Sequence, residues 1–286
     1  MAKEKPVSGG QPESAAVSES IRIENQNRAR EKRQLFLISL VSVTVCLVIW
    51  ELAVRTALIN PKYLSAPSQV FQSFIIKFYD PTPDGATLPV HFASSLYLAL
   101  VGYAAAVIIG IPLGLVMGYS RTFYRLINPI FEIVRPIPPI AWIPLSVIWL
   151  GIGTTAKGFI IFLAAFVPCV INSYTGVHQT NPTLINVAKT CGANDWQIFT
   201  TVCIPSALPL TFTGLRVALG NSWSTLVAAE LLSAKAGLGY MIQQGRSLVR
   251  PDIIIVGMLS IGITGALLSS CLSRVEKKFV KGRNER

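Results

Sequence analysis

The chain has 286 residues, of which 51% are hydrophobic and only 14% charged, and its formal net charge is +11 at pH 7. Soluble domains carry about 25% charged residues, so this composition excludes an ordinary soluble globular protein. Residues 1–33 and 274–286 are polar, and the apolar residues between them form blocks long enough to cross a bilayer, which takes about 20 residues each. The composition therefore predicts an all-α, polytopic membrane domain over residues 34–273.

Much of the positive charge lies in the two tails. Four basic residues occur between Arg28 and Arg33, and six more between Arg274 and Arg286. Basic residues beside a membrane span are typical of its cytoplasmic side and of contact with anionic lipid headgroups. The charge therefore indicates membrane lipid, and not nucleic acid, as the partner. The first 33 residues are rich in Ser, Glu, Gln and Gly, so we expect a disordered cytoplasmic tail.

In chain order, the apolar blocks predict six spans, at about residues 35–54, 94–117, 127–150, 158–177, 207–232 and 253–273. Between the first two, Ser68 to Phe78 has apolar residues at helical spacing and predicts a short interfacial helix. The second span contains Gly110, Gly114 and Gly118. Small residues at this interval allow helices to approach closely in lipid, and we expect them to pack within the bundle.

The third span contains Pro129, Pro136, Pro138, Pro139 and Pro144, which excludes an uninterrupted helix because each proline removes a backbone donor. Broken backbone at membrane depth is tolerated only inside the protein or beside a wet cavity. We therefore expect this segment to lie inside the bundle, next to any transport path. Between spans five and six, the polar residues 234–252 predict a short re-entrant or surface helix.

The positive-inside rule sets the orientation. Six spans place both tails, the turn at Arg121 and the loop at residues 178–206 on one side, which then carries about 13 basic residues against about seven on the other. The richer side is cytoplasmic, so we expect a multi-pass membrane protein with both termini in the cytoplasm.

The cytoplasmic loop from Asn181 to Pro209 reads NPTLINVAKTCGANDWQIFTTVCIPSALP. It predicts two amphipathic helices around Gly192, with Leu184, Ile185, Ala188 and Cys191 on one face of the first. Large apolar residues in a short cytoplasmic loop are costly unless they dock against something. Two alternatives remain at this point: they pack beneath the bundle, or they bind a partner.

This loop resembles the coupling motif of ABC importer permeases. That motif has two small residues after a Glu, a glycine shortly afterwards, and an aliphatic-x-aliphatic-Pro group that closes it. Here Val187 and Ala188 take the small positions, Gly192 the glycine, and residues 202–205 the closing group, whereas Asn186 replaces the usual Glu. The resemblance covers about residues 63–272, and residues 135–153 and 214–242 also resemble permeases for taurine, alkanesulfonates, nitrate and bicarbonate. The taurine and sulfonate members look most similar.

The resemblance implies a type I ABC importer fold, a place in the plasma membrane (the inner membrane of a bacterium) and a transport function for a small anion. It also implies several partners: a second copy of the chain, two cytoplasmic ATP-binding subunits and an extracytoplasmic substrate-binding protein. The coupling helix is expected at about residues 182–200. The residues expected to couple to the ATPase are Asn186, Val187, Ala188, Gly192, Ala193, Trp196, Phe199, Ile204 and Pro205.

The chain has no GxxxxGK[ST] loop to hold nucleotide phosphates, so we expect it to bind no cofactor, with ATP and Mg²⁺ on the partner. It also has no catalytic constellation and no metal-binding pattern, which argues against an enzyme. Nitrate or bicarbonate remains an alternative substrate. An ion-coupled secondary transporter is the alternative from another class, although Glu230 is its single candidate for a coupling acid at mid-membrane.

Candidates for lining a transport path come from spans three and five; they are Pro138, Pro139, Trp142, Trp223, Ser224, Thr225 and Glu230. For Glu230, a hydrogen bond to a neighbouring span is favoured over contact with an anion. For Arg135 and Arg216, structural pairing or snorkelling is favoured over substrate contact.

Overall fold

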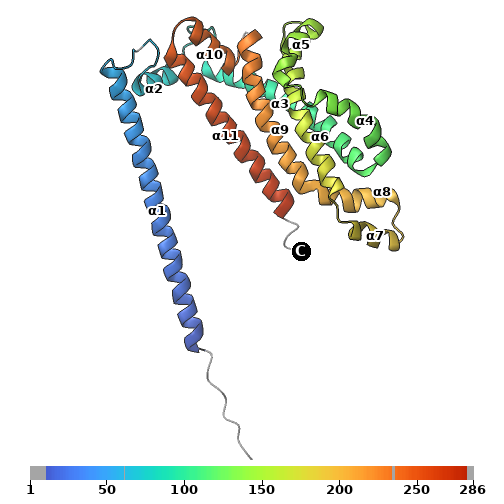
Figure 1. Ribbon diagram of the computed structural model, residues 1–286. Helices are drawn as coiled ribbons and strands as arrows, with labels where there is room; N and C mark the ends of the chain where they lie inside the picture. Colours follow the sequence, from blue (N-terminus) through green and yellow to red (C-terminus); the bar gives the residue numbers. More distant parts are fainter. Residues whose placement is uncertain (1–10, 61, 234–235, 282–286) are drawn as a thin grey trace, which may run out of the picture. The chain divides into compact units, whose positions relative to one another are not determined.

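The computed structural model describes residues 11–60, 62–233 and 236–281, and every regular element in these ranges is helical (Figure 1). Two compact units are distinguished, residues 1–68 and 69–286, and each is described by itself. The elements are α1 (Gln11–Arg55), α2 (Pro67–Ile76), α3 (Leu88–Tyr119), α4 (Arg121–Val134), η1 (Pro139–Trp142), α5 (Ile143–Leu150), α6 (Thr154–His178), α7 (Pro182–Thr190), α8 (Asp195–Ile198), η2 (Phe199–Cys203), α9 (Ile204–Ser233), α10 (Leu238–Ser247) and α11 (Pro251–Lys281).

Five helical segments of the described chain are long and apolar enough to cross a membrane; they cover residues 33–55, 88–119, 154–178, 195–231 and 251–278. The pair α4 and η1–α5, which is bent by 82°, brings the number to six when it is counted as one broken span. The predicted count of six is confirmed in this sense. The bend falls where Pro136, Pro138 and Pro139 remove three of four backbone donors.

The ends of the chain differ from the sequence-based expectation. Residues 11–33, which we expected to be disordered, form the first part of α1. This stretch is rich in Glu, Ala, Arg and Gln, which favour helix, and it continues directly into an apolar span. At the other end, α11 runs into the basic tail as far as Lys281. Residues 1–10 and 282–286 of the two tails lie outside the described residues.

The core of residues 69–286 is built on α3, α6 and α9, and glycines bring these helices close together. A Cβ atom on Gly114 of α3 would lie 2.4 Å from the carbonyl oxygen of Val170 in α6, and one on Gly118 would lie 2.7 Å from Val177 Cβ. A Cβ atom on Gly176 of α6 would likewise meet the backbone of α9, 2.9 Å away. The prediction that the glycine series packs within the bundle is confirmed.

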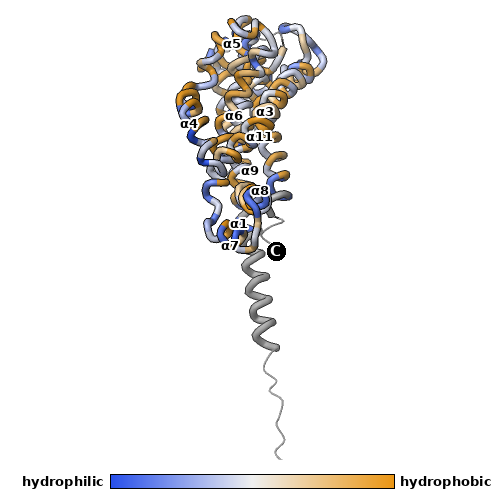
Figure 2. Tube along the Cα trace, turned by 90° about the vertical axis from the view of Figure 1, so that its right-hand side faces the viewer, coloured by the Kyte–Doolittle hydropathy of each residue, from blue (hydrophilic) through white to orange (hydrophobic). Residues whose placement is uncertain are grey.

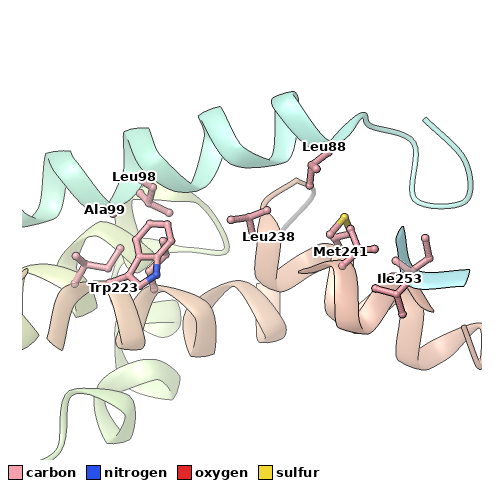
Figure 3. Packing of buried hydrophobic residues seen from close by; sticks show 11 residues of the cluster. Leu88, Leu98, Ala99, Trp223, Leu238, Met241 and Ile253 are labelled. Carbon is pink, nitrogen blue, oxygen red and sulfur yellow. The ribbon is translucent and has the colours of Figure 1, made fainter. Parts of the chain in front are cut away.

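One end of this core is closed by α10. Leu238 and Met241 of α10 are buried in one cluster with Leu88 and Leu98 of α3 and Trp223 of α9 (Figure 3). The predicted helix between the last two spans is therefore confirmed as α10, and it is part of the core. Figure 1 shows α10 and the α7–α8 pair at opposite ends of α9.

The bent span is less enclosed than the sequence predicts. Phe131 and Ile143 are buried, but Ile133 and Ile148 are 72% and 78% exposed. The bend therefore packs on the bundle with one side only, and the expectation that it lies inside the bundle of this chain is wrong. The two arms, bent by 82°, contact α3, α6 and α9 on the buried side. Figure 2 shows hydrophobic residues prevailing along α3 and α6, and hydrophilic ones around α7 and α8.

Candidate functional site

The first half of the candidate site is α7, and both of its ends are capped. At its start, the side chain of Asn181 accepts a hydrogen bond from Thr183 N at 2.9 Å, and Pro182 follows at the first helical position, which is where proline is favoured. At its end, Gly192 N donates to Lys189 O and Ala193 N donates to Ala188 O, both at 3.0 Å. This pair of bonds is the Schellman motif.

The Schellman motif explains why residue 192 is a glycine. Gly192 has φ +81°, a left-handed conformation that residues with a Cβ atom adopt at a cost. A Cβ atom there would meet nothing within 4 Å, so backbone conformation, and not space, favours glycine at this position. The motif also brings Ala188 and Ala193 together on the side that packs against the core. Three of the predicted coupling residues, Ala188, Gly192 and Ala193, thus take part in the motif that ends α7.

The second half runs without a loop into a membrane span. Asn194 and Gln197 form a reciprocal capping box with hydrogen bonds of 2.8 and 2.9 Å at the start of α8, an arrangement that fixes a helix start. α8 then continues through a π-helical turn, η2, into α9. A displacement of α8 is therefore transmitted to α9 through continuous backbone, and π turns are frequent at functional sites.

The inner face of the helix pair is held to the bundle. Ile198 and Phe199 are buried with Val177 of α6, and Ile185 and Ala188 of α7 pack against the same cluster. A hydroxyl from α3 adds a polar contact, because Tyr119 Oη donates to Asp195 O at 2.9 Å, with its ring 5.0 Å from that of Phe199. Packing beneath the bundle therefore accounts for the inner face of the α7–α8 pair.

The outer face carries three large apolar side chains among polar ones, and the described residues of this chain leave them exposed. Leu184, Val187 and Trp196 are 51%, 56% and 70% exposed, and Asn186 and Cys191 are also exposed. Leu184 and Cys191 thus point away from the bundle, so the expected common face with Ile185 and Ala188 is wrong. Both alternatives for the loop apply, one to each face: Ile185, Ala188, Ala193 and Phe199 pack inward, and Leu184, Val187 and Trp196 are available to a partner. Ile204 and Pro205 are half-buried at the start of α9.

A second candidate site is a cavity of about 370 Å³ beside the bent span. Of the predicted path residues, Pro139 and Trp142 line it, together with Arg135 from the bend and Asn221 from α9. Pro138 and Ser224 are exposed and are not part of its lining. Sequence reasoning missed Asn221, which lies two residues before Trp223 on α9.

The remaining predicted path residues are engaged in the core. Trp223 donates its Nε1 hydrogen to Ile261 O at 3.1 Å, and Thr225 is buried. Arg216 forms an ion pair with Glu276, so the predicted structural pairing is confirmed for that arginine. Arg135 Nη1 lies 3.2 Å from Glu132 Oε1, and both of these side chains are about half exposed, at 48% and 50%.

Glu230 belongs to a buried polar cluster at the opposite end of α9. Ser95 Oγ donates to its two carboxylate oxygens, at 2.7 and 2.9 Å, and Gly239 N donates at 2.9 Å. The same Ser95 Oγ accepts a hydrogen bond from Leu238 N at 2.8 Å. The predicted hydrogen bond from Glu230 to a neighbouring span is confirmed, and the carboxylate joins α3, α9 and α10.

A second group of buried polar residues lies next to this cluster and was missed by sequence reasoning. Lys77 pairs with Asp84, and Asp84 Oδ2 lies 3.2 Å from His91 Nε2. His91 Nδ1 accepts a hydrogen bond from Gly237 N at 3.0 Å, so the ring proton belongs on Nε2, facing Asp84. Burial opposes ionisation of Asp84, but its interactions with His91 and Lys77 outweigh that effect and lower the pKa of its carboxyl group.

Comparisons with known proteins agree with this architecture. Among solved structures, a chain of the MetNI methionine ABC transporter in inward-facing conformations matches with a TM-score of 0.56, over 66% of this chain and 94% of that one. At 20% identity this likeness concerns the fold alone. It supports the expected all-α, type I ABC importer fold.

Sequence relatives are more specific. The taurine transport system permease protein TauC of Escherichia coli strain K12 is 38% identical, over 88% of this chain and 92% of its own length. The nitrate import permease protein NrtB of Synechocystis is 32% identical over 84% and 88% of the two chains, and the putative aliphatic sulfonates transport permease protein SsuC of Bacillus subtilis is 28% identical over 88% and 90%. The family model for binding-protein-dependent transport system inner membrane components matches residues 110–284. This chain therefore belongs to the family of binding-protein-dependent transport system inner membrane components.

Proposed function

We propose that this chain is the permease subunit of an ATP-driven importer for a small sulfonate, with taurine as the first candidate substrate. Support for the substrate comes from the 38% identity to the taurine permease over 88% of the chain. The nitrate permease at 32% identity makes nitrate the principal alternative. Bicarbonate is the other anion suggested by the sequence pattern.

The observation that carries the coupling role is the two-sided construction of the α7–α8 pair. Caps at both helix starts and the Schellman motif at Gly192 fix the pair as a rigid unit, and its inner face is anchored in the bundle. The outer face then presents Leu184, Val187 and Trp196 to the surroundings. Exposed apolar residues on a rigid support are typical of protein docking sites, and the partner here is an ATP-binding subunit.

Family membership implies an ATPase and a binding protein as partners. We infer further that the working unit holds two copies of this chain and two ATPases, which bind ATP and Mg²⁺ in place of this chain. The α7–α8 end faces the cytoplasm together with both termini, and α10 lies at the extracytoplasmic end, where the binding protein docks. Reporter fusions to both termini test this orientation, and an extracytoplasmic signal from either one would contradict it.

The test of the proposed function starts from native membranes. We expect an ATP-binding subunit to co-purify with the affinity-tagged chain in mild detergent. The purified complex, in liposomes with its binding protein, should take up radiolabelled taurine when ATP is supplied on the cytoplasmic side. Uptake of nitrate in place of taurine would identify nitrate as the substrate. Uptake driven by an ion gradient, without an ATP-binding subunit, would establish the secondary transporter.

A further inference from the structure

The cavity beside the bent span has mostly apolar walls and one positively charged side chain among the described residues that line it. It is lined by residues of α3, α4, η1, α6 and α9, and the aromatic side chains of Phe131, Trp142, Phe162 and Phe166 form much of its wall. Among the described residues that line it, Arg135 is the charged one, and Asn221 contributes an amide. At about 370 Å³ the cavity is within the range of about 300–1,000 Å³ found for small-molecule sites.

Among the described residues, the ion pair of Arg135 stays within its own helix, whereas Arg216, the other arginine of the predicted spans, pairs with a different helix. Arg216 is paired with Glu276 across two helices. The contact of Arg135 is with Glu132 on its own helix, at 3.2 Å, and both side chains are about half exposed. Exposed pairs at this spacing contribute little to stability. The contact engages Nη1, whereas a guanidinium carries five N–H donors.

The position of Arg135 disfavours a side chain that faces lipid. It follows α4 and lies eight residues after the start of the predicted third span at residue 127, which corresponds to about 12 Å along a helix with a rise of 1.5 Å per residue. The hydrocarbon core of a bilayer is about 30 Å thick. Charged residues at such depth face the protein interior or water and mark a pathway. Arg135 lines the cavity of about 370 Å³ and also a smaller one, of about 220 Å³, which it shares with Glu132; we assign the anion to the larger one.

We propose that Arg135, with Asn221 across the cavity, is the residue that attracts and selects a small organic anion in the transport path; this proposal rests on the proposed function. A sulfonate offers several oxygens to the donor fork of a guanidinium. A short apolar chain attached to the sulfonate would lie against the aromatic wall. Glu132 is a competing partner that holds the guanidinium when no anion is present.

The first test needs no knowledge of the substrate, because iodide is a small anion that quenches tryptophan fluorescence. Trp142 lines the same cavity as Arg135, and its contribution is isolated by comparing each purified full-length protein with its Trp142→Phe counterpart. Arg135→Gln should lower iodide quenching of Trp142 by about fivefold, the factor that corresponds to the attraction of two unit charges 4 Å apart in water. Quenching by neutral acrylamide should not change.

Three further variants sharpen this test. Arg135→Lys keeps the charge and should retain most of the iodide quenching. Glu132→Gln removes the competing carboxylate and should increase the quenching. Arg216→Gln is the matched control, since that arginine is paired with Glu276 and is not part of the cavity lining, and it should quench like the parent. Equal iodide quenching of Trp142 in the parent and Arg135→Gln proteins would overturn the proposal.

The second test concerns transport by the complete importer in liposomes. Arg135→Gln should reduce ATP-dependent taurine uptake by about tenfold or more, the factor expected for losing one hydrogen bond to a charged group. Binding of the ATPase to the α7–α8 pair should be preserved. If the parent importer carries no taurine while iodide quenching still depends on Arg135, the assignment of taurine as the substrate is wrong, but the anion site at Arg135 is supported. If the parent and Arg135→Gln importers carry taurine equally, the proposed anion site at Arg135 is wrong, but the proposed importer function is supported.

Discussion

Replacement of Gly192 separates the role of the backbone at the end of α7 from the role of the docking surface. The position has φ +81° and open space around it. Alanine there introduces backbone strain without a steric clash, whereas asparagine tolerates the left-handed conformation better than other residues with a side chain. Glutamate adds a charge to the same strain, on a surface that we propose is buried when the ATPase binds.

The expected magnitudes follow from these differences. Left-handed strain costs about 1 kcal/mol for alanine, and relief of the strain would open the hydrogen bonds to Lys189 O and Ala188 O. If the ATPase binds the capped form, its Kd should rise by up to about fivefold for Gly192→Ala and less for Gly192→Asn. Burying an unpaired charge costs several kcal/mol, so Gly192→Glu should weaken binding by more than about a hundredfold.

The assay is the affinity of the purified permease for its ATPase subunit, measured together with ATP hydrolysis stimulated by the binding protein. Gly151→Ala is the control for backbone strain elsewhere in the chain. Gly151 has φ +76°, ψ 173° and open space around it, a conformation that essentially only glycine adopts, so alanine is strained there too, but the residue lies at the end of α5. This control should bind the ATPase as the parent does. If Gly192→Glu binds its ATPase and transports as well as the parent, the α7–α8 pair is not the coupling element; equal effects of alanine and asparagine would refute the backbone explanation.

Three further predictions address separate parts of the structure. Trp196→Ala should weaken ATPase binding by about thirtyfold, as for a docking residue worth about 2 kcal/mol, with Tm unchanged because the side chain is 70% exposed. Glu230→Ala should lower stability by about 3 kcal/mol, because Ser95 Oγ and Gly239 N lose a buried acceptor, whereas Ser224→Ala should be neutral. Asp84→Asn should lower Tm at neutral pH. Since the folded-state pKa of Asp84 is lowered, its stabilisation is complete above the ordinary value of 3.8 and is lost as the pH falls further, so the Tm difference should shrink in acid.

Each of these has an outcome that contradicts it. Unchanged ATPase affinity in Trp196→Ala would remove the outer face from the docking surface. A Tm for Glu230→Ala equal to that of the parent would mean that the carboxylate does not join the three helices. A Tm difference for Asp84→Asn that stays constant from neutral pH to below 3.8 would mean that ionisation of this carboxyl group does not stabilise the fold.

The sequence predicts the membrane spans well because their signal is local. About 20 apolar residues in succession are sufficient to identify a span, and a concentration of prolines is sufficient to break one. Gly192 was also predictable, since a helix that ends in a turn commonly needs a left-handed residue. The same local reasoning placed α2 and α10 correctly as short helices between spans.

Contacts between distant segments were not predictable in this way. Leu184 and Ile185 are neighbours with similar side chains, and which of them faces the bundle depends on the angle at which α7 meets Val177 and Phe199. Trp223 and Thr225 look suitable for a path from their residue types, but the rotation of α9 against α3 and α11 buries them. Asn221, on the same helix, lines the cavity instead.

The buried group of Lys77, Asp84 and His91 shows the same limit from the polar side. Each residue lies near a proline-rich connection that reads as an exposed loop, and nothing in the sequence signals that the loop folds back against α10. The contact joins residues far apart in the sequence: Gly237, 146 residues after His91, donates a backbone hydrogen bond to its ring, and the ring of Tyr240 in α10 lies 6.3 Å from it.

The glycine contacts of α3, α6 and α9 also determine which motions the molecule can make. Gly102, Gly114 and Gly118 leave α3 no space for one added methyl group against α6, and Gly214 leaves α9 none against Asn172. Sliding any of these helices by one residue would push a side chain into a neighbouring backbone, so the three cannot shear past one another. If α8 receives the motion of an ATPase as proposed, we expect the three helices to rotate as one block, with the change of shape concentrated outside it, at the proline bend before α5.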